Sequence, residues 1–156
     1  MSDQLQFSVN GHWAAGEQGS VTGDRIGRTI EFSTPPEFHG EAGFWTPEHF
    51  LLAAVASCFI ATFRAIAGFS KFDPVGLELS VEGKLEKGQG GYDFTGILLR
   101  PRLTIRDENS RLLARRFLEK TERSCLVARA LKCAVTMEPT IQVAEAEKAD
   151  LHEVVA

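Results

Sequence analysis

The sequence predicts an α+β fold with antiparallel sheets, and three features support this prediction. Residues 47–68 have the signals of one long helix that is apolar on every side. Residues 77–86 and 92–105 alternate apolar and polar side chains, as the strands of a half-buried sheet do. Strands and helices follow one another in runs rather than in strict alternation, which favours antiparallel over parallel sheet.

The composition predicts one ordinary soluble domain over residues 1–156, with a charged tail from about residue 145. The chain is 44% hydrophobic and 24% charged, which is enough apolar material for a core. Its net charge of −4 is a poor match to a nucleic-acid partner. Because the N-terminus has no basic region followed by an apolar one, we expect no signal peptide and a cytoplasmic location.

The first 43 residues predict strands joined by glycine-rich turns. Residues 7–13 and 28–33 alternate loosely and predict two strands. Residues 15–27 contain four glycines and predict a hairpin or loop, which carries Arg25. Residues 34–43 predict a loop by their proline and glycine content.

The long helix has recognisable start and stop signals. Thr46 can cap it, Pro47 suits the first helical position, and Glu48 favours the positive end of the helix dipole. Gly68 can end it. We therefore expect a helix over residues 47–68.

The apolar character of this helix predicts a homodimer. No charged residue lies between Phe50 and Phe63, a run of 14 residues. This run is shorter than the roughly 20 residues that span a bilayer, so we expect no membrane segment. A thin sheet covers only one side of such a helix, and a second copy of the chain is the simplest cover for the other.

The second half of the chain predicts a strand hairpin, two helices and a last strand. The hairpin joins 77–86 to 92–105, and Pro101 places part of its second strand at an edge or a bulge. Two helices follow and end near Arg123 and Lys132, and a strand over 134–143 is interrupted at Pro139. Polar residues are the candidate helix caps: Asn109 or Ser110 for the first helix and Ser124 for the second.

Three cysteines carry the candidate chemistry. In a chain with no export signal, cysteines favour catalysis or metal binding over a structural disulfide. Cys58 lies in the middle of the apolar helix, where a thiol is commonly a small buried apolar residue, and a reactive thiolate there would need a cation from another segment. Cys125 opens a predicted helix, where backbone N–H groups favour a thiolate. Cys133 is interpreted as a core residue.

The remaining polar residues have ordinary explanations when they are taken singly. Arg25, Arg28 and Arg64 are solvated charges by default, and Glu48 is a favourable dipole partner. A metal site is not expected, because no close cysteine pair exists and the four histidines are scattered along the chain: His12, His39, His49 and His152. No nucleotide-binding fingerprint is present either.

Three motifs in order carry more information than any one of them. They are Pro47-Glu48 followed by Leu51-Leu52-Ala53-Ala54 and Ser57-Cys58-Phe59; Cys125 followed by Val127 and Ala130-Leu131; and Gly23-Asp24-Arg25-Ile26-Gly27-Arg28. Together they resemble the osmotically inducible protein C and organic hydroperoxide resistance (OsmC/Ohr) family of thiol peroxidases. The resemblance covers nearly the whole chain and is nearer to an OsmC-like branch than to the central hydroperoxide branch.

The resemblance implies an OsmC-like fold, in which antiparallel sheets wrap long central helices in an intertwined homodimer. It implies that Cys58 is the peroxidatic cysteine and Cys125 the resolving cysteine, that Arg25 activates Cys58, and that Glu48 holds Arg25. The implied reaction is the reduction of organic hydroperoxides during oxidative stress. The implied reductant is a dithiol such as a lipoylated protein, and no haem, flavin or metal takes part.

The chemistry of the residues agrees with this resemblance and adds two qualifications. An arginine beside a thiol stabilises the thiolate and the leaving alkoxide, and an apolar helix favours alkyl or lipid peroxides as substrates. Glu48 and Cys58 are ten residues apart on one helix, about 15 Å, so either a second chain supplies one partner of Arg25 or Arg25 swings between them. Many family members have proline where this chain has Leu126, and Arg28 is an alternative to Arg25.

Two rival functions use the same fold. One is a non-catalytic dimer that binds an apolar small molecule between its helices, with Cys58 as part of the lining. The other is a redox sensor that forms the Cys58–Cys125 disulfide without rapid turnover. A binder needs none of Cys58, Cys125, Arg25 and Glu48, so the joint presence of these residues favours the enzyme.

Overall fold

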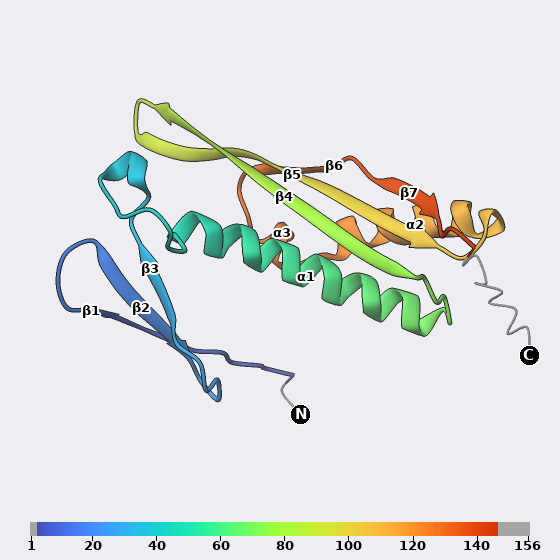
Figure 1. The fold of residues 1–156 in the computed structure, drawn as a ribbon, viewed down its shortest axis with the longest axis horizontal. Coiled ribbons are helices and arrows are strands. Elements are labelled where there is room, and N and C mark those ends of the chain that lie inside the picture. Colours follow the sequence, from blue (N-terminus) through green and yellow to red (C-terminus); the bar gives the residue numbers. More distant parts are fainter. Residues whose placement is uncertain (1–2, 147–156) are drawn as a thin grey trace, which may run out of the picture. The chain divides into compact units, whose positions relative to one another are not determined.

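The computed structural model describes residues 3–146 and confirms the α+β class. The chain forms two compact units, divided between Ala54 and Val55. Figure 1 shows the elements of each unit along the chain. His152 and most of the charged tail expected from about residue 145 lie outside the described residues.

The first unit contains a three-stranded antiparallel sheet in the order β1-β2-β3. The strands are β1 (Val9–Trp13), β2 (Gln18–Gly23) and β3 (Ile30–Ser33). The glycine-rich segment 15–27, which the sequence predicts to be a hairpin or loop, contains the β1–β2 turn and the whole of β2. Glycine is required in this strand at Gly19, because a Cβ there would lie 2.6 Å from the Phe32 ring. A 3-10 helix, Pro36–Phe38, lies in the loop that follows.

The helix α1 (Pro47–Phe69) begins where the sequence predicts. The Thr46 hydroxyl accepts a hydrogen bond from the His49 backbone N–H at 3.3 Å, while His49 Nδ1 accepts one from the Thr46 N–H at 3.2 Å. This is a capping box in which histidine takes the place of the usual glutamate or glutamine. Aromatic packing holds the helix start within the first unit, since the Phe50 ring lies 6.0 Å from those of Phe32 and Trp45.

The end of α1 differs from the prediction. Gly68 lies inside the helix, and the left-handed residue that ends it is Lys71, with a φ of 52°. The Phe72 N–H donates to the Ala67 carbonyl oxygen at 2.9 Å and the Lys71 N–H donates to that of Gly68 at 3.2 Å. This pair of bonds is a Schellman motif, which is able to impose the left-handed conformation on a residue other than glycine.

The second unit is built on the long hairpin of β4 (Gly76–Gly88) and β5 (Gly91–Ile105), which are antiparallel as predicted. The predicted last strand is two strands, β6 (Ala134–Met137) and β7 (Thr140–Val143), and both pair with β5 in parallel. The sheet is therefore mixed rather than wholly antiparallel. The reason is the helical crossover after β5, which returns the chain to the same end of the sheet.

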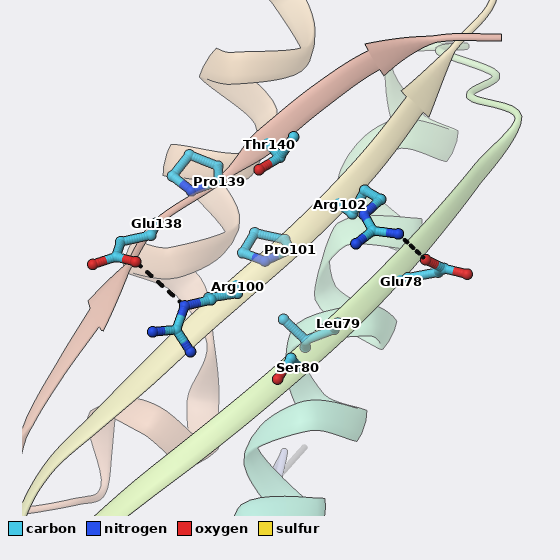
Figure 2. Close-up of a pocket in the computed structure, with 9 residues that line it drawn as sticks. All are labelled: Glu78, Leu79, Ser80, Arg100, Pro101, Arg102, Glu138, Pro139 and Thr140. Atoms are coloured by element: carbon cyan, nitrogen blue, oxygen red, sulfur yellow. Dashed lines mark hydrogen bonds and ion pairs between the residues drawn. The ribbon is translucent and has the colours of Figure 1, made fainter.

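Two prolines mark the place where β6 gives way to β7. Pro101 lies in the central strand β5, opposite Leu79 of β4, and not at an edge. On its other side, pairing stops at Leu99 and resumes at Arg102, and Pro139 lies across this gap (Figure 2). Proline has no N–H to donate, so it is tolerated in a central strand where the ladder is already broken.

The helical crossover contains α2 (Arg111–Ser124) and the short α3 (Leu126–Arg129), preceded by a 3-10 helix, Glu108–Ser110. Ser110 occupies the N-cap position of α2 without a side-chain cap bond, and the N-cap of α3 is Cys125, not Ser124. The core of this unit is formed by apolar side chains of α1, β5 and α2, each at most 2% exposed: Val55, Phe59, Phe63, Ile97, Leu99, Leu103, Ile105, Ala114 and Leu118. Full burial of each Val, Leu, Ile or Phe side chain among them contributes roughly 1.5–3 kcal/mol to the stability of the fold.

Helix α1 is poorly covered by its own chain. Within the described residues it is the helix that is long and apolar enough to cross a bilayer by length and composition, and only 22% of its most apolar 18-residue window is buried. The core helix of a soluble protein passes the same test, so this finding alone assigns no location. The uncovered surface is of the kind that a second copy would cover, and the homodimer stays a prediction.

Candidate active site

The structure brings Cys58 and Cys125 together inside the second unit. Cys58 is half-buried on α1, and Cys125 is fully buried between α2 and α3. Both are free thiols, and their side chains share a hydrogen bond. Two residues that are far apart in the sequence thus form one sulfur pair.

A break between two helices places Cys125 and its neighbours at this pair. Cys125 is extended, with φ −64° and ψ 109°, so the chain leaves α2 and restarts as the four-residue α3. The first N–H groups of a helix have no partner inside that helix. Those of Leu126 and Val127 are therefore available, and both donate to the sulfur of Cys58.

These donors make Cys58 the more acidic thiol. Burial raises the pKa of Cys58, but hydrogen bonds from the Val127 backbone, the Cys125 and Thr62 side chains and the Leu126 backbone outweigh it, and the pKa lies below its ordinary value. The donors are neutral groups that favour the anion. A thiolate at neutral pH is the nucleophilic form of cysteine.

Cys125 has the opposite character. Burial raises its pKa, and its hydrogen bond and charge interaction with Cys58 raise it further, although backbone N–H groups of Ala128 and Val127 act the other way. Cys58 is therefore the member of the pair that loses its proton more readily, and Cys125 is the one that keeps it. This is the arrangement that a nucleophile and a resolving cysteine need.

This assignment corrects the electrostatic expectation from the sequence. Position in a helix predicts a thiolate at Cys125 and a raised pKa at Cys58, whereas the structure shows both shifts in the opposite direction. The amides at the start of α3 act on the sulfur of α1 as well as on Cys125, where burial and the interaction with Cys58 outweigh them. Sequence reasoning gave no role at the Cys58 sulfur to Thr62, Leu126 or Val127. Thr62 had a local signal, since it lies one helical turn after Cys58, and Val127 had one as part of the second motif.

Arg25 lies in the first unit, at the exposed turn between β2 and β3. Its side chain is 81% exposed and pairs with Asp24 at 3.3 Å. Its φ of 61° lies in the left-handed region, which is uncommon for a residue other than glycine. Strained backbone of this kind is often found at functional sites.

Glu48 lies in the first turn of α1 and holds an unpartnered oxygen. Its Oε2 is buried and has no hydrogen-bond partner among the described residues. A buried carboxylate oxygen without a donor is costly, so the position favours a donor from outside the described residues of one chain in this conformation. The ion pair between Arg25 and Glu48, like the role of Arg28, stays a prediction.

Other candidate positions carry less chemistry. Among residues 3–146, no group of three or more His, Cys, Asp or Glu side chains is placed to hold a metal ion. Cys133 is half-buried beside β6. Figure 2 shows an open pocket of about 460 Å³ on the polar face of the sheet, where Arg100 pairs with Glu138 at 3.3 Å and Arg102 with Glu78 at 3.3 Å. These charges compensate one another, and no cysteine or histidine lines the pocket.

A half-buried cysteine on a long helix that hydrogen-bonds a buried cysteine from another segment is an arrangement typical of thiol-dependent redox proteins. The sequence model of the OsmC-like protein family matches residues 39–140. The chain therefore belongs to the OsmC-like family, as its motifs predict. Membership supports a peroxidase-type role at the level of the family.

Individual relatives agree with this placement. The chain is 25% identical over 135 residues to the uncharacterized protein YmaD of Bacillus subtilis, covering 85% of this chain and 90% of that protein. It is 26% identical over 101 residues to peroxiredoxin OsmC of Escherichia coli, covering 65% and 69%.

Solved structures share the fold. An OsmC-like protein of unknown function from Vibrio cholerae matches with a TM-score of 0.78 at 18% identity, over 87% of this chain and 99% of that one. An organic hydroperoxide resistance protein OsmC from Legionella pneumophila matches with a TM-score of 0.72 at 22% identity, over 91% and 100%.

The amide of Leu126 provides a test of the hydrogen-bonded thiolate. The Leu126 side chain is 72% exposed and opens α3, where proline is well tolerated, and the extended Cys125 tolerates a following proline. Leu126→Pro thus removes one N–H donor and little else. We expect the pKa of Cys58 to rise, because the thiolate loses one of the hydrogen bonds that stabilise its charge.

The measurement is the rate of iodoacetamide labelling of Cys58 as a function of pH, with peptides resolved by mass spectrometry. Because a raised pKa leaves less thiolate at pH 7, labelling of Leu126→Pro should slow at pH 7 and match the parent at high pH. Leu126→Ala, which keeps the N–H, is the control. Equal pH profiles for all three proteins would show that the amide does not support the thiolate.

Proposed function

We propose that this protein is a cysteine-based peroxidase that reduces organic hydroperoxides. The observation that carries the proposal is the sulfur pair, with the pKa of Cys58 lowered and that of Cys125 raised. The Cys58 thiolate attacks the outer peroxide oxygen, the O–O bond breaks, and the alkoxide leaves and takes a proton to become an alcohol. Cys58 becomes a sulfenic acid.

The second half of the cycle uses Cys125. Its sulfur attacks the Cys58 sulfenic acid, the S–O bond breaks, and water leaves as the Cys58–Cys125 disulfide forms. The thiol proton that Cys125 donates to Cys58 in the resting state leaves with the water. A dithiol such as a lipoylated protein then reduces the disulfide through a mixed disulfide. No metal or organic cofactor takes part in this cycle.

Arg25 and Glu48 are proposed to complete the site. The unpartnered Glu48 Oε2 provides an acceptor, and the guanidinium of Arg25 is a donor that keeps its charge at every working pH. A guanidinium at the sulfur pair would stabilise the developing alkoxide, which neutral donors do less well. The apolar side chains of α1 would favour alkyl or lipid peroxides over hydrogen peroxide.

The sulfur chemistry has a direct test in cysteine mapping. One equivalent of cumene hydroperoxide should convert the reduced protein to a form with a Cys58–Cys125 bridge and a free Cys133, seen by peptide mass spectrometry. Cys125→Ser should stop at a sulfenic acid on Cys58 that dimedone traps, because no thiol is there to resolve it.

Two results would exclude the proposed cycle: three free thiols after peroxide, or a bridge that includes Cys133. Formation of the bridge without catalytic turnover in the presence of a lipoylated reductant would favour the redox sensor. An unreactive Cys58 would favour the binder of apolar molecules.

Arg25 can be tested without disturbing the fold, because its backbone conformation favours glycine. Arg25→Gly should be at least as stable as the parent, since glycine adopts a φ of 61° without strain. Its rate of cumene hydroperoxide reduction should fall roughly ten- to thousandfold, in the range seen when one charge-stabilising group is removed. Stopped-flow kinetics and urea unfolding measure the two quantities.

Arg28→Ala is the matched comparison, because it removes a neighbouring arginine of the same motif. Full activity in Arg25→Gly with loss of activity in Arg28→Ala would transfer the role to Arg28. Full activity in both variants would remove arginine from the mechanism.

The homodimer is part of the proposed function, because within residues 3–146 Glu48 Oε2 has no donor and most of the apolar window of α1 is uncovered. Family membership supports such an arrangement at the family level. Light scattering at micromolar concentration should give about twice the 17.1 kDa mass of the chain. A stable monomer in solution would contradict the dimer and would leave both features unexplained.

A further inference from the structure

We propose that the outer face of α2 is a docking surface for an anionic lipid bilayer, which it contacts from one side without crossing it. This basic face consists of Arg115, Arg116, Lys120 and Arg123, together with Leu112. The docking itself does not depend on the proposed peroxidase. Its use, which is to bring the enzyme to lipid hydroperoxides, rests on that proposed function.

The packing of α2 decides which of its side chains point outward. The fully buried residues of α2 lie on the side of the helix that packs into the core: Ala114, Leu118 and Thr121. Leu112, Arg116 and Arg123 are spaced by four and seven residues, so they line up along the opposite side of the helix. Arg115 and Lys120 flank this line, and all five side chains are exposed.

The charge of the basic face is not neutralised by ion pairs. Helix α2 has five basic and two acidic residues, although the net charge of the whole chain is −4. Within residues 3–146, no carboxylate forms an ion pair with a basic side chain of this face. Arg100 and Arg102 on the sheet, by contrast, both pair with glutamates. Glu119 and Glu122 of α2 are half-buried, so the helix presents mostly positive charge to an anionic partner.

The exposed leucines favour a lipid bilayer over other anionic partners. Leu112 is 62% exposed on the same line as Arg116 and Arg123, and the adjacent Leu113 is 42% exposed. At a bilayer surface, apolar side chains enter the boundary between headgroups and acyl chains, while arginine and lysine bind the anionic headgroups. Nucleic acid would contact the basic side chains and leave the leucines in water.

Co-sedimentation with vesicles tests the docking surface. The parent should bind vesicles in which about a quarter of the phosphatidylcholine is replaced by phosphatidylglycerol, and should not bind phosphatidylcholine alone. Added salt should weaken this binding. The test variant is Arg116→Glu with Lys120→Glu, because Arg123 lies close to Cys125 in the sequence. It should bind the anionic vesicles at least roughly tenfold more weakly, since attraction becomes repulsion at two positions.

The matched control is Lys84→Glu with Lys87→Glu, which makes the same change of charge at two exposed positions of β4. It should stay within about twofold of the parent, because it leaves α2 intact. Urea unfolding checks that each variant is folded. Arg116→Gln with Lys120→Gln, for which a smaller loss is expected, replaces the double glutamate variant if that protein does not fold.

Leu112→Ser distinguishes a bilayer from other anionic partners, because it keeps every charge and removes the apolar contact. Binding to anionic vesicles should fall roughly threefold, since affinity scales with the apolar area that enters the bilayer. The inference is overturned if the parent does not bind anionic vesicles, if the β4 control is as weak as the α2 variant, or if Leu112→Ser binds like the parent.

Other occupants of the basic face have their own signatures. Binding to duplex DNA or to polyglutamate but not to vesicles would assign the face to a nucleic acid or an acidic protein and overturn the inference. A change of mass in light scattering for the α2 variant would assign the face to a contact between copies of the chain, and would overturn it equally.

Two substrates separate this inference from the proposed function. The α2 variant should reduce cumene hydroperoxide in solution as fast as the parent, but a phospholipid hydroperoxide in anionic vesicles more slowly. If the parent binds the vesicles and reduces neither peroxide, the docking surface stands and the peroxidase fails. If the parent reduces cumene hydroperoxide and does not bind the vesicles, the peroxidase stands and the docking surface fails.

Discussion

The hydrogen bonding of the Cys58 sulfur is the constraint on which the site depends. Burial of a thiolate is unfavourable, and here it is offset by neutral donors rather than by a cation in the same unit. Amide donors at a helix start are available only because α2 breaks at Cys125 and the chain restarts as α3. The break between these helices is therefore a functional feature, and one extra turn of α2 would remove it.

The core of the second unit keeps these groups in register. Cys58 lies within α1, where the nearby side chains of Phe59 and Phe63 are fully buried. Cys125 is itself fully buried at the end of α2. Close packing makes such positions hard to shift, since a small displacement opens a void or creates a clash. The separation between the two sulfurs is thus set by apolar packing rather than by the weak bond between them.

Local patterns in the sequence predicted the parts of the fold that depend on local physics. The start of α1 and the β4–β5 hairpin follow from capping residues and strict alternation. The parallel pairing of β6 and β7 was not predictable in the same way, because it depends on how the helical crossover returns to the sheet. The cysteine pair was predicted from family motifs alone. The direction of both pKa shifts was wrong from sequence, because three of the four donors to Cys58 come from a segment more than sixty residues away.

In the proposed mechanism, the neutral donors and the arginine have separable tasks. Hydrogen bonds to the resting sulfur fix how much thiolate is present, but they do not follow the charge as it moves to the leaving oxygen. A guanidinium stabilises the charge on the leaving oxygen better than a neutral donor does, because it carries a full positive charge that does not depend on pH. Arg25 at a strained turn and Glu48 with an unpartnered oxygen both lie in the first unit, whereas the sulfur pair and its neutral donors lie in the second. The chain thus prepares its nucleophile within one unit and places its charged groups in the other. In the proposed mechanism, the neutral donors therefore act on the Cys58 sulfur at rest, and the arginine acts on the charge of the transition state.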